Sequence, residues 1–286
     1  MQIGEENYLK VAIEAAIGAG KIVRERFEGK LSIESKNDRG TDLVTEFDRK
    51  SEEYIRRKLE GLGDYFYGEE SDYFNHIDQS TGKQLRDNIP IIFPKGNGWV
   101  VDPIDGTTNF VHGMENFTIS IAYVKEEIPV IGVLYFPLTD QLYYSEAGHG
   151  VWHNGRPVVK LVPAAKSLHQ ALIALEFGGF HGTLKAIDQQ RIKALVEFPV
   201  HGLRALGAAS VNILNVALGK CDGYYEMGLK PWDVAAAYVI AKELGCHFYN
   251  LKSKSKWSIS TKELLMAGTD LLAKELLAVL SQVPNQ

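Results

Sequence analysis

Residues 99–110 read WVVDPIDGTTNF, and this stretch joins an apolar run to a turn that carries two aspartates. The apolar residues 99–101 predict a buried strand, which leads directly into Asp102 and Asp105. A fold gains no stability from crowding carboxylates at one place, because like charges that lie close together repel one another. The stretch therefore indicates a site for a cation or a reaction at the end of a strand.

The turn supplies oxygen ligands and the start of a helix. Two carboxylates with the backbone carbonyl of Ile104 between them form an oxygen set that suits Mg²⁺. Gly106 lets the chain reverse, and the residues from Thr107 begin a short helix whose N–H groups could hold a phosphate. Thr108 is interpreted as its cap. A structural calcium loop is the alternative, although such loops alternate acidic and polar residues over a longer stretch.

The composition narrows the class of protein. The chain has 286 residues, of which 45% are hydrophobic and 23% charged, as in ordinary globular proteins with one large or two smaller domains. A net charge of -5 argues against a general nucleic-acid binder. Cys221 and Cys246 have no metal-ligand spacing and indicate a reducing compartment. Neither a signal peptide nor an apolar run of about 20 residues is found. We therefore expect a cytoplasmic protein without nucleic-acid or membrane partners.

The remaining chain alternates helical and strand patterns and contains no internal repeat. Apolar residues at helical spacing predict helices over 5–27, 48–62, 184–196, 207–218, 231–244 and 270–280. Short apolar or alternating runs predict strands over 65–70, 99–101, 117–124, 130–136, 141–145, 150–152, 169–175, 201–204, 221–226, 247–250 and 264–268. A strand or hairpin is expected over 30–48, a hairpin turn at Asn154-Gly155 and a surface excursion over 72–98. The pattern indicates layers of helix and sheet, α+β or α/β.

Three more carboxylates lie at junctions between predicted elements. Asp48 ends LVTEFD, Glu69 belongs to GEES and Asp233 to KPWD. Each alone has an ordinary explanation, since an aspartate at a helix start accepts backbone N–H bonds and GEES could be a plain acidic turn.

Taken in order, three motifs carry a resemblance to a known family. GEES at 68–71, WVVDPIDGTTNF at 99–110 and YYEMGLKPWDVAAA at 224–237, with Lys36 and Asp48 upstream, resemble the signatures of the inositol monophosphatase family of Mg²⁺-dependent, Li⁺-sensitive phosphomonoesterases. The resemblance implies an α/β layered sandwich of helix and sheet layers. It implies one unit over 1–286, with an N-terminal half of about 1–155, a C-terminal half of about 156–286 and the site between them. Members are often homodimers, so a homodimer is expected.

The resemblance also implies which residues bind metal and act on water. Glu69, Asp102 and the Ile104 carbonyl would hold one Mg²⁺, and Asp102, Asp105 and Asp233 a second, with a third, weaker ion near Glu69. Such ions would cancel the charge of the converging carboxylates and face the dianionic phosphate. Thr107 and Asp48 match the pair that orients and deprotonates the attacking water, which displaces the alcohol directly without a phosphoenzyme.

The implied substrate contacts lie on both sides of the phosphate ester. The family likeness assigns the phosphate to the amides of Gly106 and Thr107, a ring hydroxyl to Glu226 with help from Asp105, and the alcohol to the backbone of Gly207, Ala208 and Ala209. Two departures are visible. The family often has Ser or Thr where Ala208 stands, and the stretch over 72–98 is longer than in compact members. That stretch could cover the pocket, lie at a subunit interface or be a tolerated insertion.

The leading interpretation is hydrolysis of myo-inositol monophosphate to inositol and phosphate. A fructose-1,6-bisphosphatase would need a basic site for its second phosphate, and residues 200–209 offer only Arg204. A 3'-phosphoadenosine nucleotidase tends to have a lysine where Thr108 stands. Histidinol phosphatase activity stays open, as does a non-catalytic regulatory partner built on a phosphatase scaffold.

Overall fold

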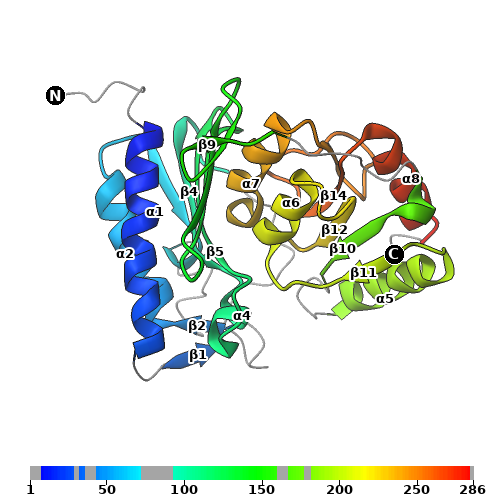
Figure 1. The fold of residues 1–286 in the computed structure, drawn as a ribbon, viewed down its shortest axis with the longest axis horizontal. Coiled ribbons are helices and arrows are strands. Elements are labelled where there is room, and N and C mark those ends of the chain that lie inside the picture. Colours follow the sequence, from blue (N-terminus) through cyan, green and yellow to red (C-terminus); the bar gives the residue numbers. More distant parts are fainter. Residues whose placement is uncertain are drawn as a thin grey trace.

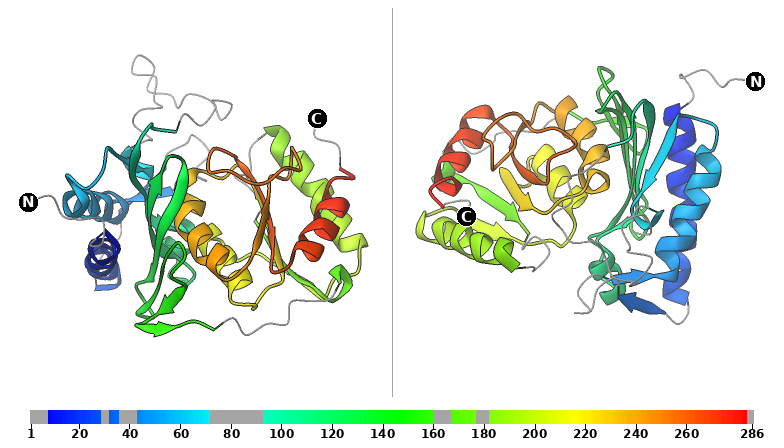
Figure 2. Two further views of the ribbon diagram at one scale, coloured as in Figure 1. Left: turned by 90° about the horizontal axis from the view of Figure 1, so that it is seen from above. Right: turned by 180° about the vertical axis from the view of Figure 1, so that it is seen from behind.

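A computed structural model describes residues 8–28, 32–35, 43–71, 93–159, 167–176 and 182–283, and these form alternating layers of helices and sheets (Figure 1). Helices α1 (Tyr8–Arg24) and α2 (Glu46–Leu59) cover the outer face of one sheet. Helices α6 (Ala209–Ala217) and α7 (Pro231–Glu243) lie between that sheet and a second one, and α5 (Gly182–Glu197) and α8 (Asp270–Leu280) close the far side (Figure 2). The predicted α/β layered sandwich is confirmed.

The first sheet has seven described strands in the order β3-β4-β5-β6-β7-β8-β9. Only β3 and β4 are parallel, and each later strand is antiparallel to its neighbour. The bounds are β3 Tyr65–Gly68, β4 Asn97–Asp105, β5 Thr118–Lys125, β6 Ile128–Phe136, β7 Gln141–Glu146, β8 Val151–His153 and β9 Arg156–Pro157. The predicted hairpin turn is confirmed, since Asn154 and Gly155 both have positive φ, 46° and 76°, between β8 and β9.

The second sheet has the order β11-β10-β12-β14-β13, in which β10 is parallel to both neighbours and β14 antiparallel to both. Its strands are β10 Leu172–Leu175, β11 Gly202–Arg204, β12 Gly223–Met227, β13 His247–Tyr249 and β14 Glu263–Ala267. The strand predicted over 169–175 is correct only from Leu172 onward. Before it, the chain forms the 3-10 helix η3 (Leu168–Gln170), because the amide of Gln170 donates back to the Ser167 carbonyl at 3.1 Å.

Smaller elements complete the N-terminal half. The expected hairpin over 30–48 is present as the antiparallel strands β1 (Ile33–Ser35) and β2 (Leu43–Thr45), with its tip outside the described residues. The first helix ends in the 3-10 helix η2 (Glu25–Glu28), and the short helix after the aspartate turn is α4 (Thr107–His112). Of the predicted surface excursion over 72–98, residues 72–92 lie outside the described residues, and β4 already begins at Asn97.

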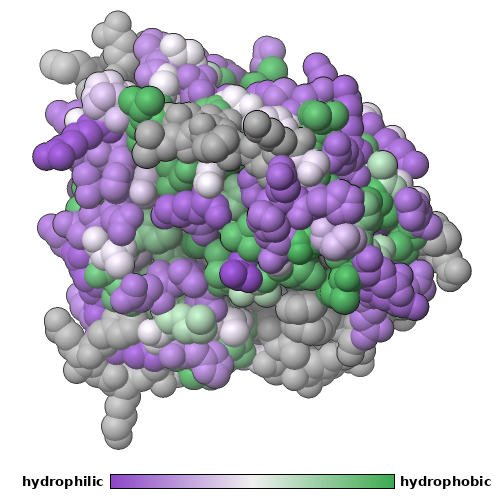
Figure 3. All heavy atoms as spheres, turned by 45° about the vertical axis from the view of Figure 1, so that its right-hand side comes forward, coloured by the Kyte–Doolittle hydropathy of each residue, from purple (hydrophilic) through white to green (hydrophobic). Residues whose placement is uncertain are grey.

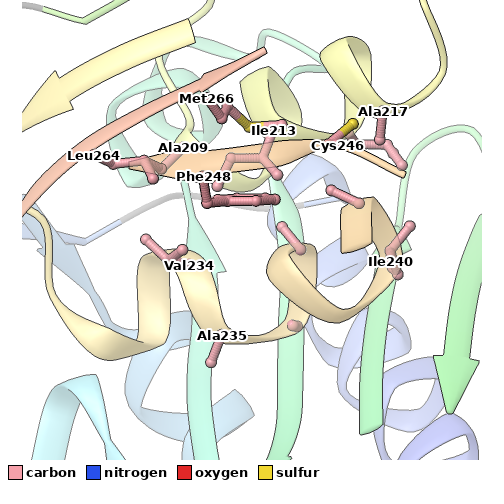
Figure 4. Packing of buried hydrophobic residues seen from close by; sticks show 14 of the residues in the cluster. Ala209, Ile213, Ala217, Val234, Ala235, Ile240, Cys246, Phe248, Leu264 and Met266 are labelled. Carbon is pink, nitrogen blue, oxygen red and sulfur yellow. The ribbon is translucent and has the colours of Figure 1, made fainter. Parts of the chain in front are cut away.

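Helix α7 is buried on all sides because it lies between the two sheets. Its Val234 and Ile240 belong to the same apolar cluster as Phe248 and Leu264 of the second sheet (Figure 4). On the other side, a side chain at Gly132 of β6 would collide with the α7 backbone, so helix and sheet are in close contact. This cluster also includes residues of β4, β5 and β6. The expectation of one unit over 1–286, with halves at about 1–155 and 156–286, stays a prediction.

The surface and the cysteines agree with an ordinary globular chain. On the face in Figure 3, hydrophilic side chains predominate and hydrophobic ones lie in smaller groups between them. Within the described ranges no helix is long and apolar enough to cross a membrane. Cys221 and Cys246 are both buried.

Candidate active site

A β-bulge in β4 places both aspartates of the 99–110 stretch on one face of the sheet. Asp102 pairs with Ser120 of β5 and Asp105 with Thr118, so the register shifts over Pro103 and Ile104. Without the shift, residues three apart would point to opposite faces. Ile104 instead joins the apolar cluster under α1 and α2, and Asp105 turns toward α6. The Ile104 amide donates to Asp102 Oδ1 at 3.0 Å, which fixes the bulge.

Asp48 and Thr107, predicted to act together on water, lie within hydrogen-bonding distance. The Thr107 hydroxyl is 3.2 Å from Asp48 Oδ1 and 3.1 Å from the Ile104 carbonyl oxygen. Asp48 is fully buried at the third position of α2, where its Oδ2 accepts from the Thr45 amide at 2.7 Å and the Thr45 hydroxyl at 2.6 Å. This capping box begins α2 at Glu46, two residues earlier than predicted, and holds the Asp48 carboxylate in place.

Gly106 is the residue on which the turn into α4 depends. It is the N-cap of α4 with φ 98°, a conformation that favours glycine, so the interpretation of Thr108 as the cap is wrong. A Cβ at Gly106 would also lie 3.0 Å from the Ala208 side chain and from the Asn116 carbonyl oxygen. The turn therefore lies directly against the start of α6, where Ala208 was predicted to meet the substrate.

Two further acids cap the central helices. Asp233 is the third residue of α7, and its Oδ2 accepts from the Lys230 amide at 2.7 Å. Helix α6 has no cap from its own N-cap residue, Ala208, and Asp105 of β4 fills that role by accepting from the Ser210 amide at 2.7 Å. A carboxylate at a helix N-terminus is stabilised by the dipole and by the unpaired N–H groups there.

The strand predicted over 65–70 ends at Gly68, and Glu69 begins a helical turn over residues 69–71 that a buried glutamate holds. Glu52 of α2, only 5% exposed, accepts from the Glu70 amide at 2.8 Å and the Ser71 amide at 3.0 Å. A side chain at Gly68 would collide with the Glu52 carboxylate, which would then have to shift. Glu52 thus fixes the GEES turn, a role for which its own sequence neighbourhood gives no signal.

The four predicted metal-binding carboxylates lie close enough to perturb one another. Burial raises the pKa of Asp102 well above its ordinary value, and the charges of Glu69, Asp105 and Asp233 raise it further. Burial likewise raises the pKa of Asp105 to about 6, against the opposing hydrogen bonds from Ser210. The pKa of Asp233 is raised by burial and then by Asp105. The structure therefore brings these four acids together as one electrostatic cluster.

This donor set fits a hard divalent cation. It consists of carboxylate oxygens with the Ile104 carbonyl beside them, and oxygen ligands are those that Mg²⁺ prefers. The cluster also carries more negative charge than a buried site can hold without a compensating cation. Among the described residues, no three acidic, His or Cys side chains converge tightly enough to enclose an ion as they stand. The neighbouring Glu69 carboxyl raises the pKa of Asp102, and a bound cation would offset this crowding of negative charge.

The predicted substrate residues lie beside the acid cluster. Glu226 on β12 accepts a hydrogen bond from the buried Tyr224 hydroxyl. Burial and the nearby Glu176 charge raise the pKa of Glu226, with smaller effects from Asp233 and Asp105. Gly207 is exposed, with φ 85°, and Ala208 and Ala209 are buried at the start of α6. Lys36, the upstream lysine of the resemblance, lies outside the described residues.

Three residues that the sequence patterns did not single out connect this site. Glu176 accepts from the amides of Leu206 and Gly207, and Asn109 of α4 donates to the Leu206 carbonyl at 2.6 Å. Ser210 donates its amide to Asp105, and its hydroxyl lies 2.7 Å from that of Thr118. Of these three residues, Asn109 alone lies within the stretch at 99–110, and its position directly after DGTT was the only sequence feature that could have pointed to its role.

Comparison with known proteins identifies the family of this chain. The model of the inositol monophosphatase family matches residues 5–285. Inositol monophosphatase 3 of Solanum lycopersicum is 35% identical over 275 residues, which cover 93% of this chain and 94% of that protein.

Solved structures of two other proteins superpose well on this chain. The extragenic suppressor protein suhB from Bartonella henselae superposes with a TM-score of 0.78 at 26% identity, covering 96% of this chain and 98% of that one. Inositol monophosphatase-II from Staphylococcus aureus has a TM-score of 0.73 at 28% identity, covering 96% and 95%. Structures of SaIMPase-II contain inositol monophosphate in one case and 2'AMP in another.

Proposed function

The chain belongs to the inositol monophosphatase family and is a phosphoric monoester hydrolase, and from this premise we propose that it hydrolyses myo-inositol monophosphate to inositol and phosphate with Mg²⁺. The observation that carries the proposal is the bulge in β4. It turns Asp102 and Asp105 to one face, next to Glu69 and Asp233, while Thr107 two residues later meets Asp48.

Glu69, Asp102 and the Ile104 carbonyl are proposed to hold one Mg²⁺, and Asp102, Asp105 and Asp233 a second, so that two or three ions occupy the cluster. When bound, Mg²⁺ would polarise the phosphoryl group and lower the pKa of a water molecule. Backbone amides hold three of these carboxylates in place even without a bound ion. Asp102 is held by the Ile104 amide, Asp105 by the Ser210 amide and Asp233 by the Lys230 amide.

Thr107 and Asp48 are proposed to orient and deprotonate the attacking water. The Thr107 hydroxyl has one proton and two acceptors within reach, Asp48 Oδ1 and the Ile104 carbonyl oxygen. When it donates to Asp48, its oxygen can accept a hydrogen bond from a water molecule. A proton can then pass from the water to Thr107 as the Thr107 proton passes to Asp48. The water oxygen bonds to phosphorus and the bond from phosphorus to the alcohol oxygen breaks. The alkoxide takes a proton from solvent to leave as the alcohol, and no phosphoenzyme forms.

The alcohol side of the site is proposed to recognise hydroxyl groups. Glu226 would accept from a ring hydroxyl, with Asp105 sharing that role, and Tyr224 holds the Glu226 carboxylate in orientation. The backbone of Gly207, Ala208 and Ala209 would meet the alcohol, and the amides of Gly106 and Thr107 the phosphate. Acceptor groups on the alcohol side suit a polyol, whose hydroxyls can all donate.

Phosphate release from a panel of substrates tests the proposal. The panel contains inositol 1-phosphate, fructose 1,6-bisphosphate, 3'-phosphoadenosine 5'-phosphate, histidinol phosphate and 2'AMP, each with Mg²⁺, with EDTA, and with Li⁺ added to Mg²⁺. We expect release that needs Mg²⁺, is suppressed by Li⁺ and is fastest with inositol phosphate. Release from none of the substrates would favour a non-catalytic regulatory partner on this scaffold.

A nucleoside monophosphate is the second candidate substrate, because SaIMPase-II has been solved with 2'AMP as well as with inositol monophosphate. The bisphosphate, histidinol phosphate and 3'-phosphoadenosine activities remain alternatives that the same panel separates. A kcat/KM for 2'AMP above that for inositol 1-phosphate would reassign the substrate without changing the proposed chemistry.

Two further proposals concern the whole molecule. We propose a homodimer, for which light scattering should give twice the chain mass of 31.8 kDa. A cytoplasmic location likewise stays a prediction, which fractionation of the source cells would check.

A further inference from the structure

Glu176 lies where β10 ends and holds a segment of chain far from it in sequence. Its Oε1 accepts from the Leu206 amide at 2.7 Å, the Gly207 amide at 2.6 Å and the Asn212 side-chain amide at 2.9 Å. All three donors reach the same oxygen. The first two lie just before α6 and the third inside it, so one carboxylate ties β10 both to the loop and to the helix.

The loop that contains Leu206 and Gly207 is held from the opposite side by α4, the helix after the proposed phosphate-binding turn. Asn109 of α4 donates to the Leu206 carbonyl at 2.6 Å and to the Asn116 carbonyl at 2.7 Å. The Leu206 residue is thus bonded through its N–H to Glu176 and through its C=O to Asn109. Gly207 follows with φ 85°, and a Cβ there would lie 2.6 Å from the Asn109 amide nitrogen, so another residue would be strained and would displace the Asn109 side chain.

These hydrogen bonds determine where the proposed alcohol-binding residues lie relative to the proposed phosphate-binding residues. Residues 207–209 are proposed to meet the alcohol, and Gly106 and Thr107, in the turn that leads to Asn109, the phosphate. A displacement of about 1 Å between two such groups is enough to slow an enzyme severely. Glu226, the proposed hydroxyl acceptor, lies near enough to Glu176 to respond to its charge, so both acids border the same region.

We propose that Glu176 is a positioning residue for substrate specificity: it fixes residues 206–209 against α4 so that their backbone and Glu226 meet the alcohol of the substrate. The inference rests on the proposed function. It assigns to Glu176 no contact with the phosphate and no proton transfer, and it depends on the acceptor oxygen of the side chain, not on its charge.

Three full-length variants test the proposal. Glu176→Ala removes the acceptor, and Glu176→Gln keeps an oxygen acceptor of the same length. Glu243→Ala is the matched control, because Glu243 also holds two loop amides, those of Gly148 and Gly150 at 2.8 and 2.9 Å, in a different loop. Steady-state kinetics would use inositol 1-phosphate and 4-nitrophenyl phosphate, whose alcohol has no ring hydroxyls.

For Glu176→Ala we expect KM for inositol 1-phosphate to rise by about tenfold or more, with a smaller change in kcat, because three hydrogen bonds that position the loop are lost. Its kcat/KM for 4-nitrophenyl phosphate should change by less than about threefold. Glu176→Gln should restore most of the loss, and Glu243→Ala should match the unchanged protein. Equal losses in the Ala and Gln variants, or equal losses on both substrates, would overturn the positioning role.

Hydrogen exchange gives a readout that does not depend on activity. The amides of Leu206 and Gly207 should exchange faster in Glu176→Ala and close to normally in Glu176→Gln. Unchanged exchange in Glu176→Ala would overturn the inference even with an active enzyme. If the unchanged protein hydrolysed neither substrate, the proposed function would fail, while the exchange rates would still decide whether Glu176 holds the loop.

Discussion

Replacing Asp105 by asparagine should stabilise the metal-free protein while it removes activity. Asp105 is buried, 7% exposed, and shares its surroundings with Glu69 and other acids. Its pKa rises from 3.8 to about 6, chiefly because burial disfavours the charged form. Asparagine is isosteric and can still accept from the Ser210 amide, so the cap of α6 is retained.

The size and the pH range of the effect follow from that pKa. A difference of one unit corresponds to about 1.4 kcal/mol, so the ionised Asp105 costs the metal-free fold on the order of 3 kcal/mol. Because the folded state binds this proton more tightly than the unfolded chain does, wild-type stability falls as the pH rises from about 4 to about 6. Asparagine has no proton to lose. The gain in stability of the variant should therefore vanish below about pH 4 and be complete above about pH 6.

Thermal unfolding in EDTA at several pH values measures this directly. At pH 7.5 the variant should unfold about 6 °C above the wild type, at roughly 2 °C per kcal/mol for a chain of this size. Mg²⁺ should raise the midpoint of the wild type more than that of the variant, since a ligand stabilises the state that binds it. Asp222→Asn is the control, because Asp222 also accepts a backbone amide, that of Leu172 at 2.8 Å, outside the acid cluster. A metal-free Asp105→Asn protein that unfolds at or below the wild-type temperature at pH 7.5 would refute the reasoning.

Three further substitutions test the remaining parts of the site. Asp102→Asn should abolish turnover and leave the circular dichroism spectrum unchanged, since it removes charge from both proposed metal positions; near-normal phosphate release would show that Asp102 does not bridge them. Thr107→Ala should lower kcat by about a hundredfold or more with KM nearly unchanged, whereas Thr107→Ser keeps the hydroxyl and most of the rate; equal losses in single-turnover assays would contradict the proton path to Asp48. Glu52→Ala should raise the Mg²⁺ concentration for half-maximal activity by about tenfold, because the Glu69 turn loses its support; an unchanged Mg²⁺ titration would remove Glu52 from the site.

The sequence predicts most of the fold wherever one residue pattern decides one element. Helix α8 was predicted over 270–280 and forms as Asp270–Leu280, since its apolar spacing and the Thr269 cap agree. Strand β4 was predicted to end at residue 101 but continues to Asp105. Pro103 interrupts the apolar pattern, and a bulge depends on pairing with β5 that no local pattern encodes.

The site was predictable in its acids and not in the groups that hold them. Asp102 and Asp105 stand out because charge at the end of an apolar strand is unusual. Glu52 and Glu176 look like ordinary surface glutamates, since their partners lie 18 and 31 residues further along the chain. The packing of α2 on β4, and the pairing of β10 with β11, bring those carboxylates to the loops they hold.

The ordinary and the functional explanations of the acids turn out to be compatible. Asp48, Asp105 and Asp233 each use Oδ2 to accept from the backbone at the start of α2, α6 and α7, as plain helix caps would. A carboxylate has a second oxygen, and in Asp48 that oxygen meets Thr107. Capping offsets part of the cost of burying each charge and also fixes where the second oxygen lies. Three helix N-termini therefore stabilise the negative charges of these carboxylates against their mutual repulsion. The fold can keep the carboxylates close together even without a bound cation.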